Sequence, residues 1–110
     1  MSRGLEAVYR LKHIGIDRVI YEYSGEDFNN SYDKKLARLY DGQIEILLSA
    51  FEEADSIDVI KSEKVSVLKC CYYAEKNSEG VDILAMFTIR NILRKYKETS
   101  EMPREGHWIV

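Results

Sequence analysis

The residues of this chain that could do chemistry are few, and their spacing matches no catalytic or metal-binding pattern. Cys70 and Cys71 are adjacent, whereas redox and zinc motifs usually place two residues between their cysteines. His13 and His107 lie near opposite ends of the chain. The sequence has no glycine-rich phosphate loop, no HExxH and no GxSxG. We therefore expect a protein that is not an enzyme and that uses no metal or cofactor.

Acidic residues are concentrated in the middle of the chain. Paired carboxylates can act as an acid and a base or bind a divalent ion. Here they lie at the end of a predicted amphipathic helix, on or near its polar side, which is typical of a solvated face. An acidic ridge can also dock on a basic surface of another protein. Positions 41 to 58 contain no basic residue. We predict partner binding by five acidic residues of this stretch: Asp41, Glu45, Glu52, Glu53 and Asp55.

Basic residues dominate positions 88 to 97, which contain no acidic residue. Either this segment neutralises the acidic ridge within one chain, or the ridge faces a partner, or the basic segment contacts phosphates. The last possibility makes the protein a nucleic-acid-associated accessory protein, which is our alternative function. Its phosphate contacts would be Arg90, Arg94, Lys95 and Lys97.

Aromatic residues suggest further contacts. Trp108, beside His107, can pin the C-terminal tail to its own core or dock on a partner, because burying an indole removes a large apolar area from water. We include Trp108 among the partner-binding residues. The chain also has eight tyrosines, which suit half-buried positions and interfaces and are compatible with a homodimer.

Apolar periodicity predicts the elements that position these residues. From Ser31 to Ala54, apolar residues recur every three or four positions, as on one face of a long helix. Similar patterns predict helices over Leu5–His13, ending at Gly15, and over Val81–Lys97. The expected fold is mainly α, a small bundle of three to five helices.

Two segments leave helix and strand open. Positions 16–24 are rich in β-forming residues, although Asp17 could cap a helical turn. Positions 63–74 favour a helix, but the run VSVLKCCYY followed by NSEG could form a hairpin. The alternative fold is therefore α+β, with a hairpin around residues 63–90.

Bulk composition limits the class of protein. The length of 110 residues predicts a single domain, 1–110, with a C-terminal tail over 100–110. A net charge of −3 argues against a general nucleic-acid or membrane binder. The sequence has no run of about 18 apolar residues and no signal-peptide pattern, so we expect a cytoplasmic protein.

The order of the segments LEAVYRLKHIG, QIEILLSAFEEA and EKVSVLKCCYYAEKN resembles small helical proteins of bacteriophages and prophages of Gram-positive bacteria. The resemblance implies an inhibitor or adaptor that acts on host machinery. Together these observations predict a non-enzymatic protein-interaction or regulatory protein that binds a protein partner through an acidic helical face.

Overall fold

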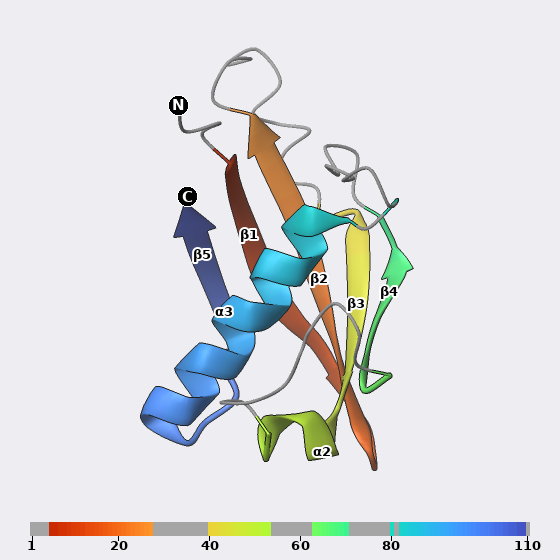
Figure 1. Cartoon of the computed structure of the whole chain (residues 1–110), viewed down its shortest axis with the longest axis vertical. Helices are drawn as coiled ribbons and strands as arrows, with labels where there is room; N and C mark the ends of the chain where they lie inside the picture. The colour runs from red at the N-terminus through yellow and green to blue at the C-terminus, as the bar shows by residue number, and fades with distance from the viewer. Residues whose placement is uncertain (1–4, 28–39, 54–62, 71–79, 81, 110) are drawn as a thin grey trace.

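The computed structural model describes residues 5–27, 40–53, 63–70, 80 and 82–109. Its elements follow the chain in the order β1 (Leu5–Ile14), β2 (Arg18–Asp27), β3 (Gly42–Leu47), α2 (Leu48–Phe51), β4 (Val65–Lys69), α3 (Ile83–Thr99) and β5 (Glu105–Ile109). The strands form one antiparallel sheet in the order β4-β3-β2-β1-β5. The first four strands are therefore a meander, and α3 carries the chain across the sheet so that β5 pairs with β1 (Figure 1).

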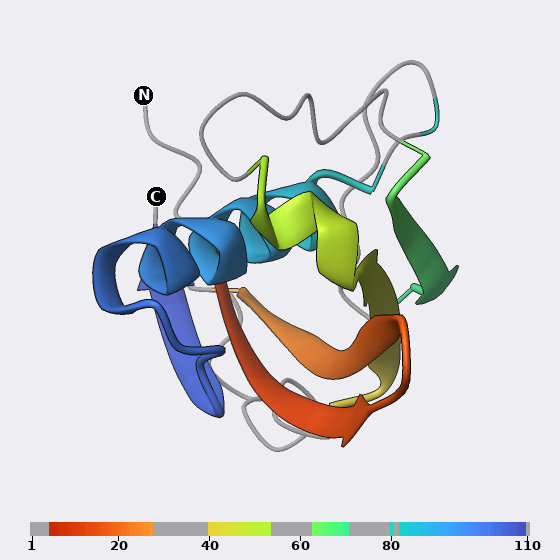
Figure 2. The ribbon, with the colours of Figure 1, turned by 90° about the horizontal axis from the view of Figure 1, so that it is seen from below.

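Both helices cover the same face of the curved sheet, which we call the inner face (Figure 2). The core lies between this face and α3, because alternate residues of each strand point toward the helix. Leu84, Ile89 and Ile92 are the main contributions of α3. The strands contribute Ala7, Tyr9, Val19, Tyr21, Tyr23, Ile44, Ile46, Val65 and Trp108. The opposite, outer face carries the other alternate residues of the strands.

Helix α3 has defined signals at both ends. The Asp82 side chain accepts a hydrogen bond from the Ala85 N–H at 3.0 Å, which satisfies one of the free first-turn amides. At the other end Ser100 adopts a left-handed conformation, with φ 62°, and donates its N–H to the Tyr96 carbonyl. These two caps define where the helix begins and ends.

One row across the inner face pairs tyrosines with glycines. Tyr9 and Tyr23 lie opposite each other on β1 and β2, and they are flanked by Gly106 on β5 and Gly42 on β3. A Cβ at Gly42 would lie 2.7 Å from Cζ of Tyr23, and a Cβ at Gly106 would overlap the Tyr9 ring. The rings thus occupy the space above the glycines, which is why a side chain is not tolerated there.

The predicted helical bundle is wrong, because the structure is dominated by the five-stranded antiparallel sheet. The segment 5–13 lies in β1 and most of 16–24 in β2, so neither forms a helix. Their apolar residues alternate in and out of the sheet, and the sequence pattern was compatible with both periods. The helix favoured over positions 63–74 is also wrong in the part that the structure describes, because Val65–Lys69 form β4.

The long helix predicted over 31–54 is wrong where the structure describes it. Gly42–Leu47 form β3, with alternate residues buried, and only Leu48–Phe51 are helical. Because β3 is followed directly by α2, the apolar residues of the two elements together have the spacing of one continuous helix. The helix predicted over 81–97 is confirmed as α3. The alternative hairpin around 63–90 is also absent from the described residues, since this range holds β4 and the first half of α3.

Candidate interaction surface

The acidic residues predicted to form one helical ridge are separated in the structure. Glu45 points to the outer face from β3 and accepts a hydrogen bond from Arg18 at 3.2 Å. Glu52 and Glu53 are exposed just after α2, and Glu53 forms an ion pair with Lys64. Asp41 is half-buried next to β3. Asp55 lies outside the described residues, so the described carboxylates make no shared acidic face.

Trp108 lies in the core of its own chain. Its side chain is 6% exposed, its indole ring packs 5.3 Å from the ring of Phe87, and its Nε1 donates to Thr88 Oγ1 at 2.8 Å. The tail is therefore strand β5 rather than a free segment, and the indole is used to dock it. His107, the next residue back, is exposed on the outer face.

The basic residues of α3 do lie together. Arg90, Arg94 and Lys97 are exposed and follow one another at spacings of four and three residues, which places them on one stripe of the helix. Lys95 lies on a neighbouring stripe, with its ammonium 6.0 Å from the Tyr9 ring centroid. In the part of the chain that the structure describes, Arg90 and Arg94 form no ion pair.

Three buried tyrosines of the inner face have structural partners for their hydroxyl groups. Tyr9 donates to Asn91 Oδ1 at 2.6 Å, Tyr21 to the Pro103 carbonyl at 2.6 Å, and Tyr23 to Asp82 Oδ2 at 2.5 Å. Burial raises the pKa of Tyr9 to about 12, so this hydroxyl keeps its proton at neutral pH. These hydroxyls tie the sheet to α3 and to the segment after it, which is a structural role.

The outer face presents cations above recessed carboxylates. Arg10 donates its Nε to Glu22 at 3.0 Å, and its guanidinium lies 4.1 Å from the ring centroid of Tyr40. Arg18 binds Glu45 in a similar way. The side chains of Arg10 and Arg18 are 50% and 45% exposed, whereas those of Glu22 and Glu45 are each 18% exposed. The outermost charge at Arg10 is therefore positive, whereas Arg18 also binds Asp17, whose side chain is 66% exposed.

The hairpin between β1 and β2 ends in an exposed apolar tip. Ile16 is fully exposed and Ile14 is 54% exposed, and this end of the hairpin extends beyond α2 (Figure 1). Large apolar side chains that stand together in water are often part of a contact surface. The tip is the one place in the described chain where two such residues lie within three positions.

The tip is held by several bonds rather than left loose. The Arg18 guanidinium donates two hydrogen bonds to the Asp17 carboxylate, of 3.0 and 3.1 Å. Leu48 donates its N–H to the Asp17 carbonyl. Gly15 closes the turn by donating its N–H to the Arg18 carbonyl. The hydrogen bonds from Arg18 lower the pKa of Asp17, so this carboxylate stays ionised and bonded at neutral pH. A braced apolar tip loses little conformational entropy when it binds.

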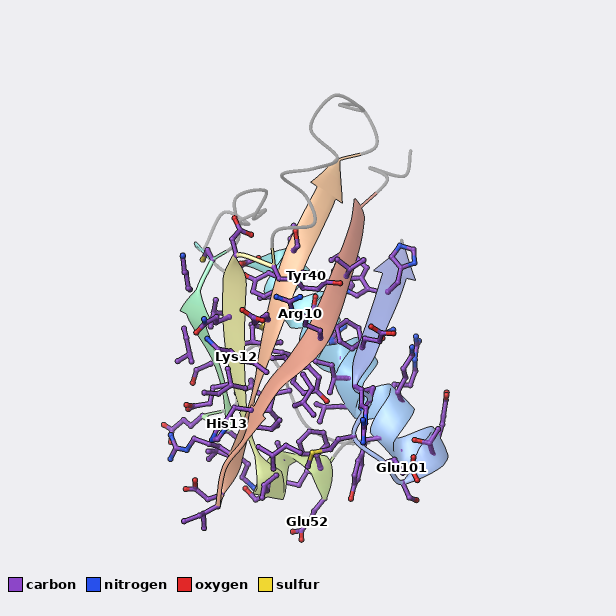
Figure 3. All side chains as sticks on the ribbon, turned by 180° about the vertical axis from the view of Figure 1, so that it is seen from behind. Arg10, Lys12, His13, Tyr40, Glu52 and Glu101 are labelled. Atoms are coloured by element: carbon purple, nitrogen blue, oxygen red, sulfur yellow. The ribbon has the colours of Figure 1, made fainter. Side chains whose placement is uncertain are left out.

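A β-bulge leads from the outer face to the tip. Leu11 lies opposite Tyr21 and His13 opposite Ile20, so Lys12 is an extra residue without a residue opposite it on β2. Such a bulge redirects side chains, and Lys12 and His13 are both exposed. Figure 3 shows Arg10, Lys12 and His13 following one another along β1. We call Arg10, Lys12, His13, Ile16 and Arg18 the hairpin surface; Ile14 lies opposite the core residue Val19 and is therefore on the inner side of the sheet.

Sequence reasoning missed the hairpin surface, although a signal was present. Gly15 was interpreted as the end of a helix, but the pair Gly15 and Asp17 between two β-forming runs is also a turn signal. The exposed cysteine is not part of this surface: Cys70 follows β4, and Cys71 lies outside the described residues.

Comparisons with protein-family models, with curated proteins and with solved structures found no match. The hairpin surface is thus interpreted from its own geometry. None of the described helices is long and apolar enough to cross a membrane. Among the described residues, no three His, Cys, Asp or Glu side chains are grouped so that they could hold a metal ion.

Proposed function

We propose that this protein acts by binding another protein through the hairpin surface, without a catalytic step of its own. The observation that carries the proposal is Ile16, which is fully exposed at the end of a braced turn. Full burial of one such side chain in a partner is worth about 1.5–3 kcal/mol. An inhibitor or adaptor that acts on host machinery in the cytoplasm, as the resemblance to phage proteins implies, would work in this way.

The surface differs from the acidic helical face expected from sequence. That face is not formed by the described residues, because the acidic segment includes a strand whose Glu45 is covered by Arg18. The tyrosines that suggested a homodimer include Tyr9, Tyr21 and Tyr23, which are buried in the core. A homodimer therefore remains a separate proposal, which light scattering over a range of protein concentrations would test.

Comparison of two serine variants tests the hairpin surface. Ile16→Ser removes the apolar anchor, whereas Leu68→Ser removes a 48% exposed apolar side chain from β4, at the far edge of the sheet. The wild type and both variants are immobilised, exposed to an extract of the source organism, and the bound proteins are quantified by mass spectrometry. We expect a specific set of proteins to be lost with Ile16→Ser and kept with Leu68→Ser. Equal retention by both variants contradicts the proposal.

A second candidate function is nucleic-acid binding by α3. It is supported by Arg90 and Arg94, which are exposed, aligned on one stripe and without an ion pair in the described structure. Such contacts would weaken steeply with salt. Fluorescence anisotropy with labelled single-stranded DNA and RNA at low and high salt tests it. Binding that persists unchanged in the Arg90→Glu, Arg94→Glu double variant rules out this helix as the site.

A further inference from the structure

We infer that the partner of the hairpin surface presents carboxylates beside an apolar socket, and this inference rests on the function proposed above. The first reason is the charge that the surface exposes. Arg10 and Lys12 project to solvent, while Glu22 is recessed beneath the Arg10 guanidinium. Arg18 is already bound by the carboxylates of Asp17 and Glu45. A partner that approaches the outer face along β1 thus meets cations first, and carboxylates are the complementary groups of a protein.

The second reason is that Arg10 is already positioned for a carboxylate. Its Nε donates to Glu22 and its Cζ lies over the Tyr40 ring, 4.1 Å from the centroid, and these are the polar and ring contacts that the structure gives it. The two Nη nitrogens are therefore left with donors for a ligand. A guanidinium held in place by a cation–π contact and one hydrogen bond needs little further ordering to bind a carboxylate through its Nη groups.

The third reason is the position of Lys12. The bulge leaves it without a cross-strand neighbour on β2, and in the described structure its ammonium makes no ion pair. Lys12 lies between Arg10 and the apolar tip on the same strand. At about 3.3 Å per residue, the four residue steps from Lys12 to Ile16 span at most about 13 Å of chain. A carboxylate of the partner that pairs with Lys12 should therefore lie within about 13 Å of the socket that receives Ile16.

Two other anionic surfaces fit the hairpin surface less well. An anionic membrane would have to accept Asp17, whose carboxylate is 66% exposed beside Ile16 at the end of the turn. A nucleic acid offers phosphates to Arg10 and Lys12 but no apolar socket for Ile16. A protein surface can provide both the carboxylates and the socket, so it is the occupant that the geometry favours.

Short synthetic peptides of defined charge test this inference on the full chain. One peptide alternates glutamate and leucine, and its control has lysine in place of each glutamate. Binding is followed by anisotropy of the labelled peptide and by amide shifts of the ¹⁵N-labelled protein. We expect the acidic peptide to bind, with shifts centred on positions 10–18, and the basic control not to bind. Affinity should fall when salt is raised.

Charge variants locate the contact. Arg10→Gln and Lys12→Glu should each weaken binding of the acidic peptide, by up to about fivefold for an exposed charge. Arg90→Glu, on α3, is the matched control and should leave binding unchanged. The thermal unfolding of each variant confirms that it is folded. Anionic phosphatidylserine vesicles and single-stranded DNA are titrated in parallel.

The outcomes separate this inference from the proposed function. Absence of binding by the acidic peptide, or equal binding by the basic one, overturns the acidic partner. Binding of vesicles or DNA that is lost in Lys12→Glu also overturns it, in favour of those surfaces. In either case the proposed function still stands if Ile16→Ser loses its partners from the extract. If Ile16→Ser keeps those partners, the hairpin surface itself is wrong.

Discussion

The two faces of the sheet use polar side chains in opposite ways. On the inner face, three tyrosine hydroxyls are buried, and each donates to a group of α3, of its N-cap or of the segment that follows it. On the outer face, Arg10 and Arg18 make longer hydrogen bonds to Glu22 and Glu45, of 3.0 and 3.2 Å, and remain about half exposed. The difference in burial decides what each bond is worth, because water competes for the outer pairs and not for the inner ones.

The molecule can therefore change more freely on its outer face than on its inner face without unfolding. Inner-face groups determine how α3 packs on the sheet, so removing them should lower the free energy of unfolding. Outer-face groups contribute little to the free energy of unfolding, so their side chains can be used to bind a partner. Substitutions on the two faces should therefore separate into stability effects and binding effects.

The largest effect is expected where a tyrosine ring covers a glycine. Gly42→Ala places a Cβ against the buried Tyr23 ring, and overpacking of this kind costs about 3 kcal/mol. Urea unfolding of Gly42→Ala measures the loss. In a Tyr23→Leu background the same substitution should cost at least about 1 kcal/mol less, because the ring is gone. An equal cost in both backgrounds would show that the ring is not the cause.

These Tyr–Gly pairs also show why the sheet could not be predicted from the sequence. Gly42 falls within the helix predicted over 31–54, and Gly106 within the predicted tail over 100–110. Their partners Tyr23 and Tyr9 are distant in sequence and meet them only when the strands pair. By contrast, α3 was predicted because its apolar stripe is local and long enough to be unambiguous.

The strands were missed for a second, local reason. In β1 the alternation of buried Ala7 and Tyr9 is obscured by the half-buried Val8 and by the bulge at Lys12. In β3 the alternation of Ile44 and Ile46 runs directly into α2. Short apolar runs of this kind fit both periods, and tertiary pairing decides between them. The same mistake hid the hairpin surface, since a turn at Gly15 is visible only once both flanks are strands.

Asp82 makes two inner-face hydrogen bonds, so its substitution should give the next largest loss of stability. It caps α3 and also accepts the Tyr23 hydroxyl. Asp82→Ala removes the cap and leaves a buried hydroxyl without its acceptor, for a combined cost of about 2 kcal/mol. Asp82→Asn keeps an acceptor oxygen for one of these contacts and should lose less. Chemical denaturation of both variants checks the order, and a smaller loss for alanine than for asparagine would contradict it.

Tyr9→Phe tests a single inner-face hydrogen bond and its pH dependence. At neutral pH the loss should be about 1 kcal/mol, because Asn91 keeps its place but loses its donor. The pKa of Tyr9 is raised to about 12 in the folded state, above its ordinary value of 10.0. Its contribution is therefore complete below pH 10 and falls as the pH rises toward 12, by up to about 1.4 kcal/mol per pH unit.

Unfolding curves between pH 8 and pH 12 measure this slope. Tyr9→Phe should lose stability less steeply above pH 10 than the wild type does. Burial also raises the pKa of Tyr21, which remains in the variant, so part of the slope should persist. Parallel curves for the wild type and the variant would contradict the burial of the Tyr9 hydroxyl.

The smallest effect on stability is expected on the outer face, at Arg10. Arg10→Gln removes an ion pair with Glu22 and a contact with Tyr40, yet the half-exposed guanidinium should contribute only about 0.5–1 kcal/mol. High salt should reduce the difference from the wild type, because an exposed pair is screened. Urea unfolding at low and high salt measures both. A loss as large as that of Asp82→Ala would mean that the outer face also specifies the fold, and the division of labour between the two faces would then fail.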